Sequence, residues 1–121
     1  MTKILVIEDA QPLRKDIVEM LMFEGFDVVG AENGLVGVQC ALEVNPDLII
    51  CDIMMPVLDG YETTRQIRLQ PKFKDLPILA LTAKAMKEDR EKCLAAGAND
   101  YLSKPVDIDR LFSMLHVWLY Q

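Results

Sequence analysis

The sequence has few of the residues that bind transition metals or build a disulfide framework. Its 121 residues include three cysteines and a single histidine. Cys40, Cys51 and Cys93 are far apart, show no C-x-x-C spacing for zinc and are odd in number, so we expect reduced thiols that pack as small hydrophobes. His116 stands alone among apolar neighbours, which excludes a histidine metal cluster and argues against a catalytic role.

A long apolar run and a surplus of positive charge are absent as well. No stretch approaches the roughly 20 apolar residues that span a bilayer, and the first residues lack a signal-peptide pattern. The net charge of −6 argues against a nucleic-acid surface, since phosphate backbones are bound through lysine and arginine clusters. We therefore expect no membrane or nucleic-acid partner and, by default, a cytoplasmic location. The length suits one domain, residues 1–121.

Five short apolar runs are each followed by a helical pattern, which predicts an α/β protein. Because the runs are apolar on both faces, they predict a five-stranded parallel sheet covered by helices on both sides. Right-handed crossovers make a doubly wound sheet the simplest arrangement. The expected strands are 3–7, 26–31, 48–52, 78–81 and 100–102, and the expected helices are about 12–24, 34–44, 60–69, 84–96 and 108–119. Asn33 and Asp107 are candidate helix N-caps, and Gly25 is a candidate helix stop. Arg65 and Arg68 are expected on the solvated side of the third helix.

The third apolar run ends on an aspartate. Leu48 to Cys51 suit a buried strand and lead directly into Asp52, and the following Met55-Pro56 and Asp59-Gly60 steps indicate a loop that enters a helix. In an open parallel sheet, ligands bind outside the carboxyl ends of the strands. Asp52 is therefore placed for chemistry, and we interpret it as a nucleophile that accepts a phosphoryl group.

Other polar residues end the first, fourth and fifth strands. They are Glu8 with Asp9, Thr82 and Lys104, and we expect them to meet Asp52 at one edge of the sheet. Three carboxylates in one pocket repel each other and need a cation to stay ionised. Carboxylate oxygens without nearby histidine or cysteine suit Mg²⁺ or Mn²⁺. With the Lys104 charge and the Thr82 hydroxyl, they predict a site for a phosphoryl group beside a divalent ion.

Five motifs at these strand ends and loops occur together along the chain. They are Ile7-Glu8-Asp9, Asp52 with Met55-Pro56 and Asp59-Gly60, Leu81-Thr82-Ala83, Ala95-Ala96-Gly97-Ala98, and Tyr101-Leu102-Ser103-Lys104-Pro105. Through these motifs, the chain resembles the receiver domains of two-component response regulators over essentially its whole length. The resemblance implies a flavodoxin-like (βα)5 fold with strand order 2-1-3-4-5.

The resemblance implies a role for each acidic residue. Asp52 is implied to be the phosphoacceptor. Asp9, Asp52 and the main-chain carbonyl of Met54 are implied to be ligands of Mg²⁺ or Mn²⁺, and Glu8 is implied to act through a metal-bound water. Many family members have aspartate in place of Glu8, and the longer side chain is expected to alter how that water is held without abolishing metal binding.

The resemblance also implies roles for residues at the ends of the fourth and fifth strands. Lys104, Thr82 and Ala83 are implied to bind the phosphoryl group. Thr82 and Tyr101 are the implied switch pair, in which the hydroxyl moves toward the phosphate and the ring turns inward. A cis peptide bond is expected before Pro105, where the chain turns while Lys104 reaches back to the sheet.

The absence of a glycine-rich nucleotide loop means that phosphate must come from an activated donor. By resemblance, the donor is a phosphohistidine on a sensor histidine kinase or a histidine phosphotransfer protein. Phosphorylation is expected to change the surface of the last two helices and the fifth strand, and so to control a partner or output domain. The chain would catalyse only its own phosphoryl transfer and slow autodephosphorylation. Met1 lies two residues before the first strand, as expected of a single-domain regulator or an amino-terminal receiver.

Three other functions are less consistent with these residues. A phosphatase that forms an aspartyl-phosphate usually has a second acid two residues after the nucleophile, and here that residue is Met54. A flavodoxin-like cofactor binder would need a phosphate loop after the first strand, where Glu8 and Asp9 would repel phosphate. A degenerate receiver that serves only as an interaction module would not need the complete set of site residues.

Overall fold

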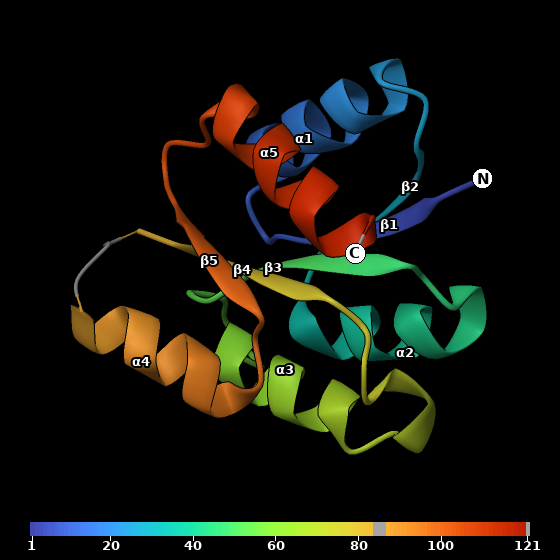
Figure 1. Cartoon of the computed structure of the whole chain (residues 1–121). Coiled ribbons are helices and arrows are strands. Elements are labelled where there is room, and N and C mark those ends of the chain that lie inside the picture. The colour runs from blue at the N-terminus through green and yellow to red at the C-terminus, as the bar shows by residue number, and fades with distance from the viewer. Residues whose placement is uncertain (84–86, 121) are drawn as a thin grey trace.

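The computed structural model describes residues 1–83 and 87–120, in which strands and α-helices alternate (Figure 1). The elements are β1 (Lys3–Ile7), α1 (Gln11–Phe23), β2 (Asp27–Ala31), α2 (Gly34–Val44), β3 (Leu48–Asp52), α3 (Gly60–Arg68), a 3-10 turn (Pro71–Phe73), β4 (Ile78–Thr82), α4 (Lys87–Ala96), β5 (Asp100–Ser103) and α5 (Ile108–Leu119). Among the described residues, no helix has the length and apolar character needed to cross a membrane.

The five strands form one parallel sheet in the order β2-β1-β3-β4-β5, which confirms the predicted fold. Helices α1 and α5 cover one face, and α2, α3 and α4 cover the other (Figure 1). In the register, Ile7 lies beside Cys51, Asp52 beside Leu81, and Thr82 beside Ser103. The carboxyl ends of β1, β3, β4 and β5 therefore lie at one edge of the sheet.

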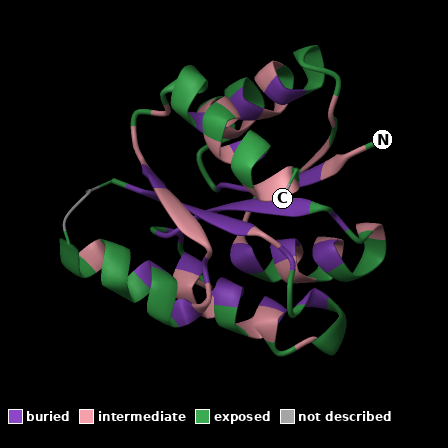
Figure 2. Ribbon diagram, in the orientation of Figure 1, coloured by how far each residue is buried: buried purple, intermediate pink, exposed green. Residues whose placement is uncertain are grey.

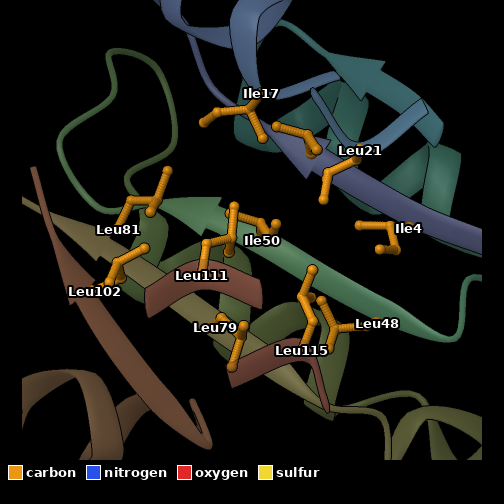
Figure 3. Close-up of a cluster of buried hydrophobic side chains, with 11 residues drawn as sticks. Ile4, Ile17, Leu21, Leu48, Ile50, Leu79, Leu81, Leu102, Leu111 and Leu115 are labelled. Carbon is orange, nitrogen blue, oxygen red and sulfur yellow. The ribbon is translucent and has the colours of Figure 1, made fainter. Parts of the chain in front are cut away.

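The central strands are buried on both faces because each face is covered by helices (Figure 2). Every residue of β3 and β4 is buried. One apolar cluster joins strand residues such as Ile50 to Ile17 of α1 and Leu111 of α5 (Figure 3). The neighbouring Ile49 belongs to a second cluster, which contains Ile67 of α3. Alternate strand residues thus face opposite helix layers, which explains the unbroken apolar runs.

Local capping signals agree with the structure. The side chain of Asn33 accepts a hydrogen bond from the Val36 N–H at 2.8 Å, and Asp107 accepts from the Asp109 N–H at 3.0 Å, so both are helix N-caps. Gly25, at φ 96°, follows α1 as predicted. For the helix expected over 84–96, the described part begins at Lys87, and residues 84–86 lie outside the described residues.

The interpretation of Arg68 as a solvated residue of the third helix is wrong. Its guanidinium donates to the Gly97 carbonyl at 3.0 Å, the Phe73 carbonyl at 2.7 Å and the Asn99 Oδ1 atom at 2.7 Å. The same Asn99 oxygen accepts from the Ile78 N–H at 2.8 Å. Arg68 is the last residue of α3, so its long side chain reaches beyond the helix to the following turn and the loop before β5. It ties these segments together.

We expect Arg68→Met to lower the free energy of unfolding by about 2–3 kcal/mol, because it removes charged hydrogen bonds and leaves half-buried acceptors without a donor. Arg65→Met is the matched control on the same helix. Arg65 is 55% exposed and pairs only with Glu62 among the described residues, so its loss should stay within about 0.5 kcal/mol. Urea unfolding of both variants measures the difference, and equal losses would contradict the assigned role.

Candidate functional site

Three carboxylates lie together at the carboxyl edge of the sheet. Glu8 and Asp9 directly follow β1, and Asp52 is the last residue of β3. One oxygen from each carboxylate lies within 4.8 Å of the others. Glu8 and Asp52 are buried, with 0% and 1% of their surface exposed, whereas Asp9 is exposed. The structure therefore brings Asp52 beside two acids from a distant part of the sequence.

Lys104 reaches these acids from the end of β5. Its Nζ atom lies 2.9 Å from Glu8 Oε1 and 3.0 Å from Asp52 Oδ1. The Lys104 N–H donates to the Thr82 carbonyl at 2.7 Å, which fixes the start of this loop against β4. The peptide bond between Lys104 and Pro105 is cis, as predicted. One ammonium group thus joins two buried carboxylates from two other strands.

The charges in this cluster shift one another's protonation. Burial, followed by contact with Asp52, raises the pKa of Glu8 to about 7 although Lys104 lowers it. Burial would raise the pKa of Asp9, but contacts with Glu8 and Asp52 outweigh it and the pKa falls. Burial would lower the pKa of Lys104, but both carboxylates outweigh it and the pKa rises. Near neutral pH, Glu8 is therefore close to the midpoint of its titration, while Lys104 stays charged.

The donor atoms fit a hard divalent cation. Asp52 Oδ2 is buried, and no hydrogen bond reaches it from the part of the chain that the structure describes. A buried carboxylate oxygen without a partner is costly, and three carboxylates without histidine or cysteine suit Mg²⁺ or Mn²⁺. The Met54 N–H donates to Asp52 Oδ1 at 3.4 Å, while 71% of the Met54 residue is exposed.

Thr82 and Tyr101 lie on neighbouring strands beside this cluster. Thr82 ends β4 and is buried, and Ala83 follows it at the exposed rim. Tyr101 is half-buried on β5 and packs against a small buried cluster that includes Ile53. Arg90 of α4 lies over the Tyr101 ring, 5.9 Å from its centroid. The expected switch pair is thus on adjacent strands, with an α4 residue covering the ring.

His116 and the three cysteines were not expected to take part in the site. His116 is exposed on α5, where its ring lies 5.2 Å from that of Tyr120. Cys51 and Cys93 are buried and Cys40 is half-buried, and all three are free thiols.

Gly60 packs directly against the peptide that carries Asp52. Its N–H donates to the Ile53 carbonyl at 2.9 Å, and a Cβ atom here would collide with the Asp52 carbonyl and the Ile53 main chain. Any side chain at this position would push against the peptide that carries Asp52. The Asp59-Gly60 pair was the only sequence signal, and it indicated a loop.

Comparison with known proteins identifies the family. The model of the response regulator receiver domain matches residues 4–116. The chain therefore belongs to the receiver domain family of two-component response regulators, which are signalling domains.

The chain is similar to proteins from several organisms. It is 41% identical over 118 residues to the probable transcriptional regulator ycf29 of Porphyra purpurea, covering 98% of this chain. The fold matches the Vibrio cholerae chemotaxis protein CheY4 with a TM-score of 0.94 and 32% identity, covering 98% of this chain and 99% of that chain. The receiver domain of the Pseudomonas aeruginosa sensor histidine kinase PA1611, with Mg²⁺ coordinated in its active-site cleft, gives a TM-score of 0.89 and 41% identity, covering 99% and 98%.

The curated relatives are longer than this chain. The chain spans 56% of the Porphyra purpurea protein and 49% of the Synechocystis regulator RpaA, which is about half of their length.

The raised pKa of Glu8 predicts a pH-dependent stability in metal-free protein. Between about pH 4.5 and pH 7, folded Glu8 holds a proton that the unfolded chain releases. The contribution of this proton to the free energy of unfolding is complete below pH 4.5 and is lost as the pH rises through 7. Relative to that of Glu8→Gln, the free energy of unfolding of the wild type should fall by up to about 3 kcal/mol as the pH rises across this interval. Urea unfolding in EDTA at several pH values measures the difference, and a constant or rising difference would contradict the shift.

Proposed function

We propose that residues 1–121 act as one receiver domain in which Asp52 accepts a phosphoryl group. The donor is a phosphohistidine on a sensor histidine kinase or a histidine phosphotransfer protein. The observation that carries this proposal is the contact of Lys104 Nζ with Asp52 Oδ1 at 3.0 Å. The other carboxylate oxygen, Asp52 Oδ2, is buried and accepts no hydrogen bond from the described residues.

The phosphoryl group would pass directly from the donor to Asp52 in an in-line displacement. A carboxylate oxygen of Asp52 attacks phosphorus and forms an O–P bond, while the N–P bond breaks and its electron pair returns to the imidazole. Lys104 moves no proton and neutralises the charge of the phosphoryl oxygens. Asp9, Asp52 and the Met54 carbonyl would hold Mg²⁺ or Mn²⁺, with Glu8 acting through a water on the ion, and the ion would supply further positive charge when bound. The Thr82 hydroxyl and the region of Ala83 would bind the remaining phosphoryl oxygens.

A phosphatase acting on small phosphoesters is a weaker alternative. Such a reaction needs an acid to protonate the leaving group, and Met54, two residues after Asp52, has a thioether with no proton to give. A phosphohistidine donor needs less help, because an imidazole is a good leaving group. The available groups therefore favour acceptance of a phosphoryl group over turnover of an ester.

The output of the domain would be a surface change. The Thr82 hydroxyl moves toward the phosphoryl group, which frees space for the Tyr101 ring to turn inward. The ring already packs against the cluster that includes Ile53 and lies under Arg90, so its movement would change contacts of α4, β5 and α5. A partner or output domain that prefers one arrangement would then be controlled by phosphorylation.

We expect acetyl phosphate to add one phosphoryl group to the wild type in the presence of Mg²⁺ and none in EDTA, because the acid cluster must be neutralised before an anionic donor approaches. Asp52→Asn should gain no phosphoryl group. Asp59→Asn is the matched control, since asparagine can still cap α3 and Asp59 is not in the cluster. Intact mass measures the product, and equal incorporation in wild type and Asp52→Asn would sink the assignment.

Thr82→Ala should still accept phosphate but lose most of the coupling to the distant surface, because the hydroxyl that responds to the phosphoryl group is gone. Thr82→Ser keeps the hydroxyl and is the control. Amide hydrogen exchange over residues 87–119, with and without a beryllium fluoride mimic, measures the coupling. If Thr82→Ala and wild type show the same change in protection, this switch is excluded.

A further inference from the structure

Arg14 contacts the loop that carries two of the three acids. It lies in the first turn of α1, and its Nη1 atom donates to the main-chain carbonyl of Glu8 at 2.8 Å. Its own N–H donates to the Ala10 carbonyl at 2.9 Å. On the strand side, the Glu8 N–H donates to the Ala31 carbonyl at 3.0 Å. Arg14, on α1, thus holds the peptide group that joins Glu8 to Asp9.

Gly30 of β2 leaves the space in which the Arg14 side chain lies. A Cβ atom at Gly30 would be 3.3 Å from Arg14 Cδ and 3.5 Å from Cγ, so the methylene groups pass directly over this glycine. Arg14 is half-buried and forms no ion pair with any residue in the described ranges 1–83 and 87–120. Its guanidinium is therefore committed to a main-chain carbonyl and not to a carboxylate.

The bonded carbonyl belongs to the peptide between Glu8 and Asp9, which sets the direction of both side chains. Glu8 Oε2 also accepts from the Ala10 N–H at 3.2 Å, so the loop is held close to the cluster. We propose that Arg14 is a positioning residue for the divalent-cation site: by holding the Glu8 carbonyl, it keeps the Glu8 and Asp9 carboxylates directed toward Asp52. The proposal rests on the metal site of the proposed function.

Electrostatics and positioning predict opposite effects when Arg14 is removed. Its positive charge repels a cation, so loss of charge alone would tighten Mg²⁺ binding. Loss of the hydrogen bond would loosen the Glu8–Asp9 peptide and weaken binding, as removal of supporting hydrogen bonds does at other metal sites. The sign of the change therefore separates the two effects.

The test compares wild type, Arg14→Met, Arg14→Lys and Lys15→Met. Each protein is titrated with MgCl₂, and binding is monitored by backbone amide NMR. Lys15 is the matched charge control, because its side chain is 69% exposed and pairs with Glu19. We expect about tenfold weaker Mg²⁺ binding for Arg14→Met. Arg14→Lys, which keeps a charged donor, should restore most of the affinity, and Lys15→Met should bind as well as wild type or slightly better.

A second variant, Gly30→Ala, displaces the Arg14 side chain without removing it and serves if Arg14→Met does not fold. It should weaken binding in the same direction but less. In metal-free protein, the Ala10 amide should exchange faster in Arg14→Met than in Lys15→Met. Unchanged or tighter Mg²⁺ binding in Arg14→Met, with normal wild-type binding, would overturn this inference alone. A wild type that binds no Mg²⁺ would overturn the proposed metal site and this inference together.

Discussion

The contact of one ammonium group with two buried carboxylates is the interaction on which the site depends. Lys104 Nζ lies 2.9 Å from Glu8 and 3.0 Å from Asp52, and the two acids come from different strands. Burying carboxylates without a counter-charge is strongly unfavourable. The parallel order of the strands satisfies this requirement, because β1, β3 and β5 deliver all three groups to the same edge. The continuous apolar strands hold them there.

The fold was predictable because its signals are local and repeated. Strands such as β3 are apolar on both faces, which only a sheet covered on two sides can accommodate. Asn33 and Asp107 precede helical patterns and cap the helices in the structure. The convergence of Glu8, Asp52 and Lys104 followed from the same logic, since parallel strands end together. The family resemblance supplied the strand order and the individual roles.

Most of the contacts that were missed involve main-chain atoms. Arg68 was expected to be solvated, because helical periodicity gives the direction of a side chain but not how far it reaches beyond the helix end. Arg14 bonds the Glu8 carbonyl, and a carbonyl is present in every residue, so no residue type marks the acceptor. Gly60 packs against the peptide of Asp52, a contact that depends on how the loop closes. Such contacts appear only when the backbone path is known.

The order in which the chain supplies the charged groups affects its synthesis. As the polypeptide leaves the ribosome, Glu8, Asp9 and Asp52 emerge well before Lys104. A nascent sheet built from β1, β2 and β3 would gather acids at its edge with no ammonium beside them, and this repulsion disfavours early closure of the core. β5 is the least buried of the strands near the site, with only Leu102 fully covered. The counter-charge of the acids therefore becomes available only after this edge strand has emerged, shortly before α5 completes the apolar core.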